Sequence, residues 1–244
     1  MKQLVKESVI SILIATGIFG VVVLFLHLCG WLISPDGHLT DPLLPLELVA
    51  GIIGSAYILM VRNPQNFLGF VAGIIMSILL GIQFYLQDQI EQTLLYYMVF
   101  IPCETYTLVK WIRGRQVAKN EYTIPSFLGA GRMIVMLIIF IIIVIAVLTF
   151  LKDEITLAAV MSAMVVGSST LANFLMIRKR TDTWIYWMVS SVTGIIFLLC
   201  MHNYITLTMY VVYLFINGSA CIAWMKQTPK DRRGWLMRSA WKRK

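Results

Sequence analysis

Two tryptophans three residues apart, Trp184 and Trp187, are the first side chains in this sequence whose spacing suggests chemistry. Residues i and i+3 share one helical face, and a buried indole N–H needs a hydrogen-bond acceptor. A planar cation against such rings gains stacking and about 1–2 kcal/mol of cation–π attraction in a desolvated slot. An interfacial aromatic belt is the alternative, and it explains Trp184 better than the deeper Trp187. We predict ligand contact for Trp187 and leave both interpretations open for Trp184.

Glu104 is the only acidic residue well inside an expected membrane span. A charge there costs at least about 2.5 kcal/mol, so a functional role is the first hypothesis. Two structural explanations stay open: protonation of the carboxyl, and a hydrogen bond to backbone that Pro102 frees.

Other polar side chains lie at related depths in the expected spans. Some lie near the membrane centre, as Glu104 does, one lies about 10 Å inward by the helical rise, level with Trp187, and others lie in the outer half. The candidate solute-binding residues are the two tryptophans and Glu104, with Ser191 and Asn217 at the centre, Asn173 inward of it, and Gln83, Tyr97 and Tyr210 in the outer half.

Sequence motifs of most enzyme classes are missing. Walker loops, nucleophile elbows and zincin motifs are absent, and the cysteines and histidines do not have metal-ligand spacing. We therefore predict no catalytic residue, no metal and no cofactor. A membrane enzyme acting on lipid is a weaker alternative, since its acidic candidates, Glu121, Asp182 and Asp231, are scattered among Lys and Arg.

The elements that must position these residues are membrane helices. Hydrophobic residues make up 59% of the 244, charged residues 13%, and the mean hydropathy is +0.81. Runs that can cross a hydrocarbon core of about 30 Å predict eight spans. They cover roughly residues 8–33, 45–61, 66–86, 92–112, 133–151, 155–177, 184–201 and 205–225.

The basic residues give the orientation. With the N-terminus in the cytoplasm, all 20 Lys and Arg except Lys152 fall inside, as the positive-inside rule predicts. We predict a multi-pass protein of the bacterial cytoplasmic membrane with both termini cytoplasmic. The net charge of +8 then reflects membrane topology, and we predict no nucleic acid partner. The basic tail is expected to rest on anionic lipid headgroups, with a partner-binding scaffold role as the alternative.

An internal repeat organises the spans. The segment from Ala56 to Arg62 resembles the segment from Ala172 to Arg178, and later matches include Tyr97 with Tyr210 and Trp111 with Trp224. The second to fourth spans therefore repeat as the sixth to eighth, in parallel orientation because the fifth span intervenes. Such repeats place a solute site near the midplane where the units meet.

The predicted fold class is an all-α membrane protein, with a seven-helix core and an added N-terminal helix. The domains are residues 1–44 (added helix and outer loop), 45–112 (first three-helix repeat), 113–154 (loop and linker helix), 155–226 (second repeat) and 227–244 (basic tail).

The stretch from about Pro45 to Lys226 resembles the PnuC-type vitamin transporters, typified by the nicotinamide riboside transporter. The resemblance is most specific from Ala172 to Arg180, in Trp184-Ile185-Tyr186-Trp187, and from Tyr204 to Tyr210. It implies two parallel three-helix bundles joined by one helix, as in SWEET sugar transporters. It also implies facilitated diffusion, trapping by phosphorylation, and substrate contacts from Trp184 and Trp187.

Two positions depart from the family pattern. Ser191 stands where the family has Asn or Asp, and Tyr97 where it often has Gln, so the hydrogen-bonding capacity of the site is altered. The leading hypothesis is uniport of nicotinamide riboside, and the alternatives with the same mechanism are thiamin, riboflavin and a (deoxy)nucleoside. A homo-oligomer is compatible with the sequence.

Overall fold

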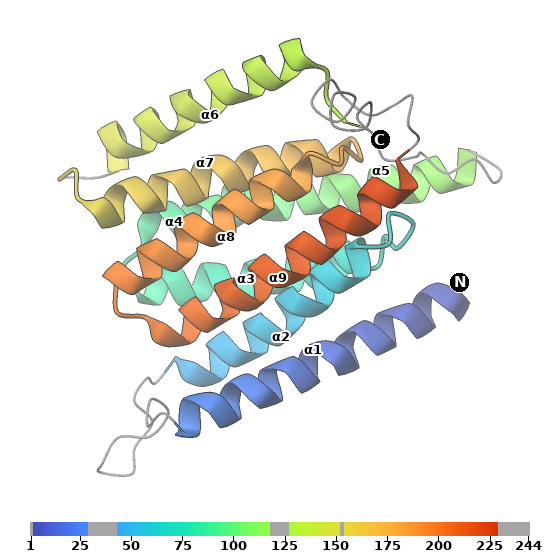
Figure 1. Ribbon diagram of the computed structural model, residues 1–244, viewed down its shortest axis with the longest axis horizontal. Coiled ribbons are helices and arrows are strands. Elements are labelled where there is room, and N and C mark those ends of the chain that lie inside the picture. Colours follow the sequence, from blue (N-terminus) through green and yellow to red (C-terminus); the bar gives the residue numbers. More distant parts are fainter. Residues whose placement is uncertain (1, 29–42, 118–126, 152–153, 229–244) are drawn as a thin grey trace, which may run out of the picture.

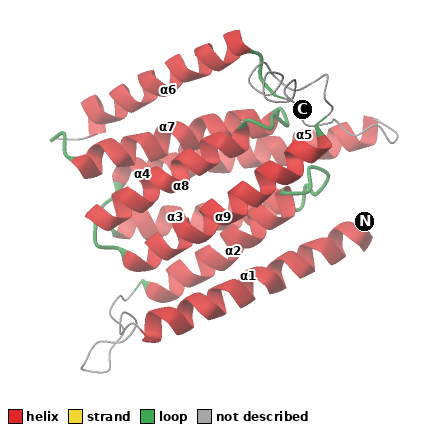
Figure 2. Ribbon diagram, viewed as in Figure 1, coloured by secondary structure: helices red, strands yellow, loops and turns green. Residues whose placement is uncertain are grey.

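The computed structural model describes residues 2–28, 43–117, 127–151 and 154–228, and this part of the chain is helical almost throughout (Figure 2). Lipid offers no hydrogen-bond partner to the backbone, so apolar segments of this length fold as helices that satisfy their own N–H and C=O groups. The helices are α1 (Lys2–Leu28), α2 (Leu44–Val61), α3 (Gly69–Leu86), α4 (Ile90–Leu94), the π-helical segment η1 (Leu95–Phe100), α5 (Ile101–Val117), α6 (Ala130–Leu151), α7 (Leu157–Ile177), α8 (Thr183–Cys200) and α9 (Tyr204–Gln227).

Seven of these helices are long and apolar enough to cross a membrane: α1, α2, α3, α6, α7, α8 and α9. The fourth expected span, 92–112, is built by α4, η1 and α5, which follow one another without a break. The π-helical turn interrupts its regular α-helix. The other expected spans agree with the helices to within a few residues, except that α1 begins near Lys2 instead of residue 8 and is described only to Leu28.

The helices form one bundle with α1 and α6 at opposite edges (Figure 1). Within the bundle α2 packs on α3 and α9, while α7 packs on α8 and α5. The edge helix α1 contacts α2, and α6 contacts α7. The first helix of each expected repeat thus contacts the third helix of the other.

The two ends of the bundle differ in charge. Every Lys and Arg in the described part lies at the end that holds the N-terminal end of α1 and the C-terminal end of α9 (Figure 1). We call this the basic end. At the opposite end the described charged residues near the helix termini are acidic, among them Asp88, Glu91 and Glu154.

At the end opposite the basic end, a hydrogen-bond network around Glu47 links three helices. The Glu47 carboxylate accepts bonds from Gln83 Nε2 (2.8 Å) and Thr206 Oγ1 (2.9 Å), and both partners are fully buried. Gln87 and Asn203 also donate to it, at 3.1 and 3.2 Å. The network ties α2, α3 and the start of α9 together.

A second polar cluster at this end joins α4 to α7. Ser162 Oγ donates to Glu91 Oε1 at 2.7 Å and accepts from Gln92 Nε2 at 3.1 Å. All three side chains are buried, so each needs a protein partner. The two clusters fix the two expected units against each other at the same end.

A close contact between α1 and α2 yields the first prediction. A Cβ at Gly51 would lie 2.3 Å from Phe19 Cε1, so Gly51→Leu should push α1 away and lower the free energy of unfolding by about 1–3 kcal/mol. Gly20→Leu is the matched control, because nothing lies within 4 Å of its Cβ position. Melting temperatures in detergent compare them, and equal values for both variants would show that α1 does not pack on α2 in this way.

Candidate solute-binding site

A cavity lies at the centre of the bundle, where the two expected units meet. Its walls come from α2, α3, η1, α7, α8 and α9. The cavity has a volume of about 40 Å³. Ligand pockets commonly measure about 300–1,000 Å³, so this conformation is nearly closed.

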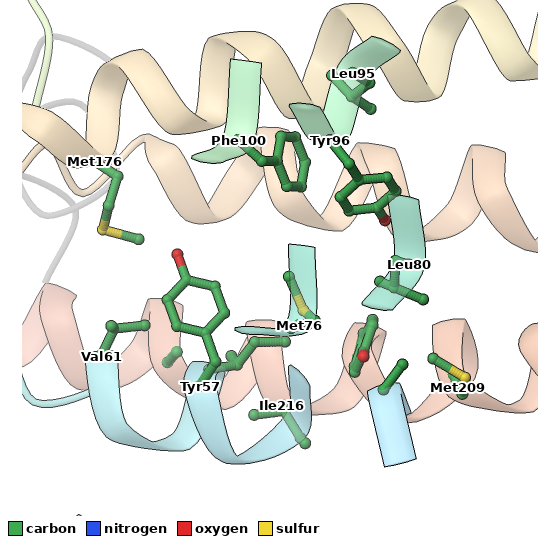
Figure 3. Close-up of a cluster of buried hydrophobic side chains, with 14 of the residues drawn as sticks. Tyr57, Val61, Met76, Leu80, Leu95, Tyr96, Phe100, Met176, Met209 and Ile216 are labelled. Carbon is green, nitrogen blue, oxygen red and sulfur yellow. The ribbon is translucent and has the colours of Figure 1, made fainter. Parts of the chain in front are cut away.

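Aromatic rings make up much of the cavity wall. Phe100 from η1 and Trp187 from α8 meet edge to face, with ring centroids 5.6 Å apart. Tyr96, Tyr210 and Tyr213 lie further along the wall, and the Tyr210 and Tyr213 centroids are 6.0 Å apart. Figure 3 shows Tyr57 directing its hydroxyl toward Met176, while Phe100 and Tyr96 approach from the facing segment. A planar, apolar or cationic ring fits such a lining.

Four buried polar atoms on the cavity wall have no hydrogen-bond partner among the described residues. They are the hydroxyls of Tyr57 and Tyr213, Nε1 of Trp184 and Oδ1 of Asn217. Leaving such a group unpaired costs about 1–3 kcal/mol, so each unpaired atom calls for an explanation. A ligand that offers both donors and acceptors would supply the missing partners.

Other polar groups of the wall are already paired within the protein. The Ser169 and Ser190 hydroxyls are 2.7 Å apart, joining α7 to α8. Asn217 Nδ2 donates to Ser191 Oγ at 3.2 Å, and Ser191 donates to the Trp187 carbonyl. These bonds set the positions of Asn217 and Trp187 without using the oxygen of the Asn217 amide.

Five of the nine residues expected from sequence line this cavity: Trp184, Trp187, Ser191, Tyr210 and Asn217. Trp187 is half-buried and Trp184 is 1% exposed, so Trp184 lies well inside the protein. Burial of this degree places its indole among other side chains.

Glu104 lies just behind the cavity wall. Ser77 Oγ donates to Glu104 Oε2 at 3.0 Å, and Oε1 has no partner among the described residues. The absence of a side chain at Gly73 makes room for it, since a Cβ there would lie 2.8 Å from Oε1 and 3.1 Å from the Tyr57 ring. The carboxyl group therefore borders Tyr57, which does line the cavity.

Three expected residues lie elsewhere. Gln83 belongs to the Glu47 network, and Asn173 Nδ2 donates to the Ser169 carbonyl at 3.1 Å. Tyr97 packs against Gly81 of α3, and its hydroxyl reaches the Ile78 carbonyl at 3.5 Å. In this conformation none of the three lines the cavity.

Reasoning from sequence missed Tyr57, Tyr96 and Tyr213 as cavity residues. Two of them carried a usable signal in the repeat: Tyr57 aligns with Asn173, and Tyr213 aligns with Phe100. Tyr96 had no such signal, because the repeat alignment selects its neighbour Tyr97.

Aromatic packing closes the cavity toward the basic end. Trp184 and Trp224 meet edge to face at 5.5 Å, Trp224 lies 6.4 Å from Trp111, and Trp224 Nε1 donates to the Val61 carbonyl. Lys179, in the α7–α8 loop, lies 4.2 Å over the Trp111 ring. Burial lowers the pKa of this lysine to about 8.

The chain from residue 44 to 226 matches the family described as nicotinamide mononucleotide transporter. The chain belongs to this family. The matched residues cover about three quarters of the sequence, including every helix of the cavity wall. They also coincide with the stretch that resembles the PnuC-type transporters, so membership of that family is confirmed.

A solved structure, "Crystal structure of the Vitamin B3 transporter PnuC", has the same fold. The TM-score is 0.69 at 19% sequence identity, over 90% of this chain and 91% of that one. No curated protein matches significantly in sequence. The family and the similar structure are both transporters, so this chain is a multi-pass membrane protein of a transporter family for nicotinamide-related compounds.

The unpaired tyrosine hydroxyls yield the second prediction. Because Tyr213 Oη has no partner, Tyr213→Phe should leave the free energy of unfolding unchanged or raise it. Ser190→Ala is the control, because it leaves the buried Ser169 hydroxyl without its partner and should lower stability by about 1 kcal/mol. Thermal melting of the solute-free protein measures both, and an equal loss in Tyr213→Phe would mean that its hydroxyl is already satisfied.

Proposed function

We propose that this protein carries nicotinamide riboside across the cytoplasmic membrane by facilitated diffusion. The supporting observation is the central cavity, where aromatic rings surround four unpaired polar atoms. Nicotinamide riboside combines a planar cationic ring with a carboxamide and ribose hydroxyls. The ring would lie against Trp187, and the polar groups would pair with Tyr57, Tyr213 and Asn217.

A buried carboxyl group behind the cavity wall is able to interact with a cationic solute. Glu104 lies behind the wall, next to Tyr57, which lines the cavity. A negative or proton-sharing group behind an aromatic wall stabilises a cation in front of it. Thiamin is also a cation, and riboflavin and deoxynucleosides are planar, so these three are the alternative substrates for the same mechanism.

The proposed mechanism is alternating access between two parallel three-helix units. We assign α2, α3 and α4–η1–α5 to the first unit, α7, α8 and α9 to the second, α6 to the linker, and α1 to an added helix. The reciprocal contacts α2–α9 and α7–α5 support this assignment. In the orientation that the positive-inside rule favours, the basic end faces the cytoplasm.

The nearly closed cavity corresponds to an occluded state in this scheme. The walls must separate to admit a nucleoside, at one end and then at the other, around a fixed central site. Phosphorylation in the cytoplasm would add charge to the product and prevent its return through an aromatic passage. Uptake would then continue without an ion gradient.

The third prediction concerns the aromatic contact. Trp187→Ala should weaken nicotinamide riboside binding by about 2 kcal/mol, or roughly 30-fold in Kd, because the cation–π contact is lost. Ile185→Ala is the matched control on the same helix, since Ile185 is exposed on the lipid side. Quenching of tryptophan fluorescence measures binding, with thiamin, riboflavin and common nucleosides in the same screen. Unchanged affinity in Trp187→Ala would remove that residue from the site.

The fourth prediction concerns energy coupling. Uptake of radiolabelled nicotinamide riboside into proteoliposomes should equilibrate at the external concentration and should be unaffected by a protonophore, because a uniporter uses only the solute gradient. Liposomes without protein provide the background. Accumulation above equilibrium, or loss of uptake with the protonophore, would instead show coupling to protons.

A further inference from the structure

Before the π-helical segment η1 ends, the residues that occupy equivalent buried positions in the two units are shifted by one from the sequence alignment of the repeats. In α9 the buried residues that precede the cavity are Thr206, Met209 and Tyr210. In the first unit, Gln92, Leu95 and Tyr96 are buried with the same spacing. The residues that the sequence alignment pairs with Thr206 and Tyr210 are Thr93 and Tyr97, and both are only partly buried. The hydrogen bonds agree, since Gln92 contacts α7 as Thr206 contacts α2.

Beyond η1 the two units return to the register of the sequence alignment. The buried residues of α9 in this part are Tyr213, Ile216, Asn217, Ala220, Cys221 and Trp224. Five of their six aligned partners are also buried, namely Phe100, Cys103, Glu104, Thr107 and Trp111, while Leu108, the partner of Cys221, is partly buried. The π-helical turn therefore absorbs one extra residue between Tyr96 and Phe100, as π-bulges do near functional sites.

The extra residue places Tyr96 opposite Tyr210. Both tyrosines line the cavity, one from each proposed unit, and their side chains lie close enough to interact with each other. Tyr96 is also stacked on Phe84, with ring centroids 5.7 Å apart and planes 9° from parallel. Tyr97 instead faces Gly81, outside the cavity.

The tyrosine pair stands between the central cavity and a second cleft. That cleft, of about 340 Å³, opens at the end opposite the basic one, and Phe84, Phe197 and Leu198 are part of its lining. Tyr96 stacks on Phe84, while Tyr210 belongs to one apolar cluster with Phe197 and Leu198. A solute moving from this cleft to the cavity has to pass the pair.

We propose that Tyr96 is the first-unit counterpart of Tyr210, and that their hydroxyls hydrogen-bond to each other and close the cavity on its outer side. The proposal rests on the proposed transport function and its orientation. One tyrosine comes from each unit, so separation of the units breaks the hydrogen bond and frees both hydroxyls for a passing solute. Tyr96 is thereby also a solute-contact residue, in the role that the sequence alignment gives to Tyr97.

Solvent access from outside tests the closure without any substrate. In a variant whose native cysteines are replaced by alanine, Ser190→Cys places a thiol on the cavity wall. Tyr96→Phe and Tyr210→Phe each remove the proposed inter-unit hydrogen bond and should speed labelling by an external, membrane-impermeant thiol reagent about fivefold. Tyr97→Phe is the matched control and should leave the rate unchanged. Equal acceleration by Tyr97→Phe, or none by Tyr96→Phe, overturns the proposal.

Deletion of Met98 tests the register. Met98 is 69% exposed in the middle of η1, and without it a regular α-helix would place Tyr96 three residues before Phe100, as Tyr210 precedes Tyr213. The deletion variant should fold, keep slow labelling of the thiol introduced by Ser190→Cys, and still respond to Tyr96→Phe. If Tyr97→Phe speeds labelling of the deletion variant and Tyr96→Phe does not, the proposal is wrong. If the deletion variant does not fold, the labelling rates of Tyr96→Phe and Tyr97→Phe in the full-length chain decide whether the proposal holds.

Nicotinamide riboside uptake by the same variants separates the two proposals. Tyr96→Phe should raise the KM several-fold, and Tyr97→Phe should not. If the wild-type protein does not carry nicotinamide riboside while the labelling pattern holds, the substrate assignment fails and the tyrosine closure stands. If uptake occurs but Tyr96→Phe changes neither labelling nor KM, the closure fails and the transport function stands.

Discussion

Polar groups inside a membrane-embedded bundle can hydrogen-bond only with other protein groups or with a bound molecule. This chain satisfies the constraint in most places. Glu47 on α2 accepts hydrogen bonds from side chains of α3 and of the start of α9, and Ser162 bonds to both Glu91 and Gln92. The constraint is left unmet at several buried atoms of the described residues, and four of these atoms lie on the wall of the central cavity. Four unpaired polar atoms around one cavity are suited to a ligand that supplies their hydrogen-bond partners.

Aromatic side chains lie on both sides of the central cavity along the proposed solute path. Trp184, Trp224 and Trp111 fill the basic end, and Lys179 covers the last of these rings. In the proposed closure, Tyr96 and Tyr210 lie on the other side of the cavity, one from each proposed unit. Rings are suited to this task because they exclude water and still slide past a planar solute. The cavity lies between the two closures, where movement of the units would expose it to each side in turn.

Much of this could be predicted from the sequence, because the signals involved are long. Apolar runs gave the helices, and the residues that suggested the family lie in the matched region. Single contacts were harder to predict. Gln83 was expected at the site, yet it pairs with Glu47, a partner 36 residues away. Tyr97 was expected because the repeat aligns it with Tyr210, but a one-residue π-helical turn presents Tyr96, and no sequence pattern marks such a turn.

The central claim is that a nicotinamide-bearing cation occupies the cavity between the two units. A structure of the protein determined with saturating nicotinamide riboside tests it most directly. The account predicts ligand density in this cavity, with the pyridinium ring against Trp187 and polar groups within hydrogen-bonding distance of Tyr57, Tyr213 and Asn217. Ligand density at another place in the bundle, with these four residues unchanged and the cavity still closed, would contradict it.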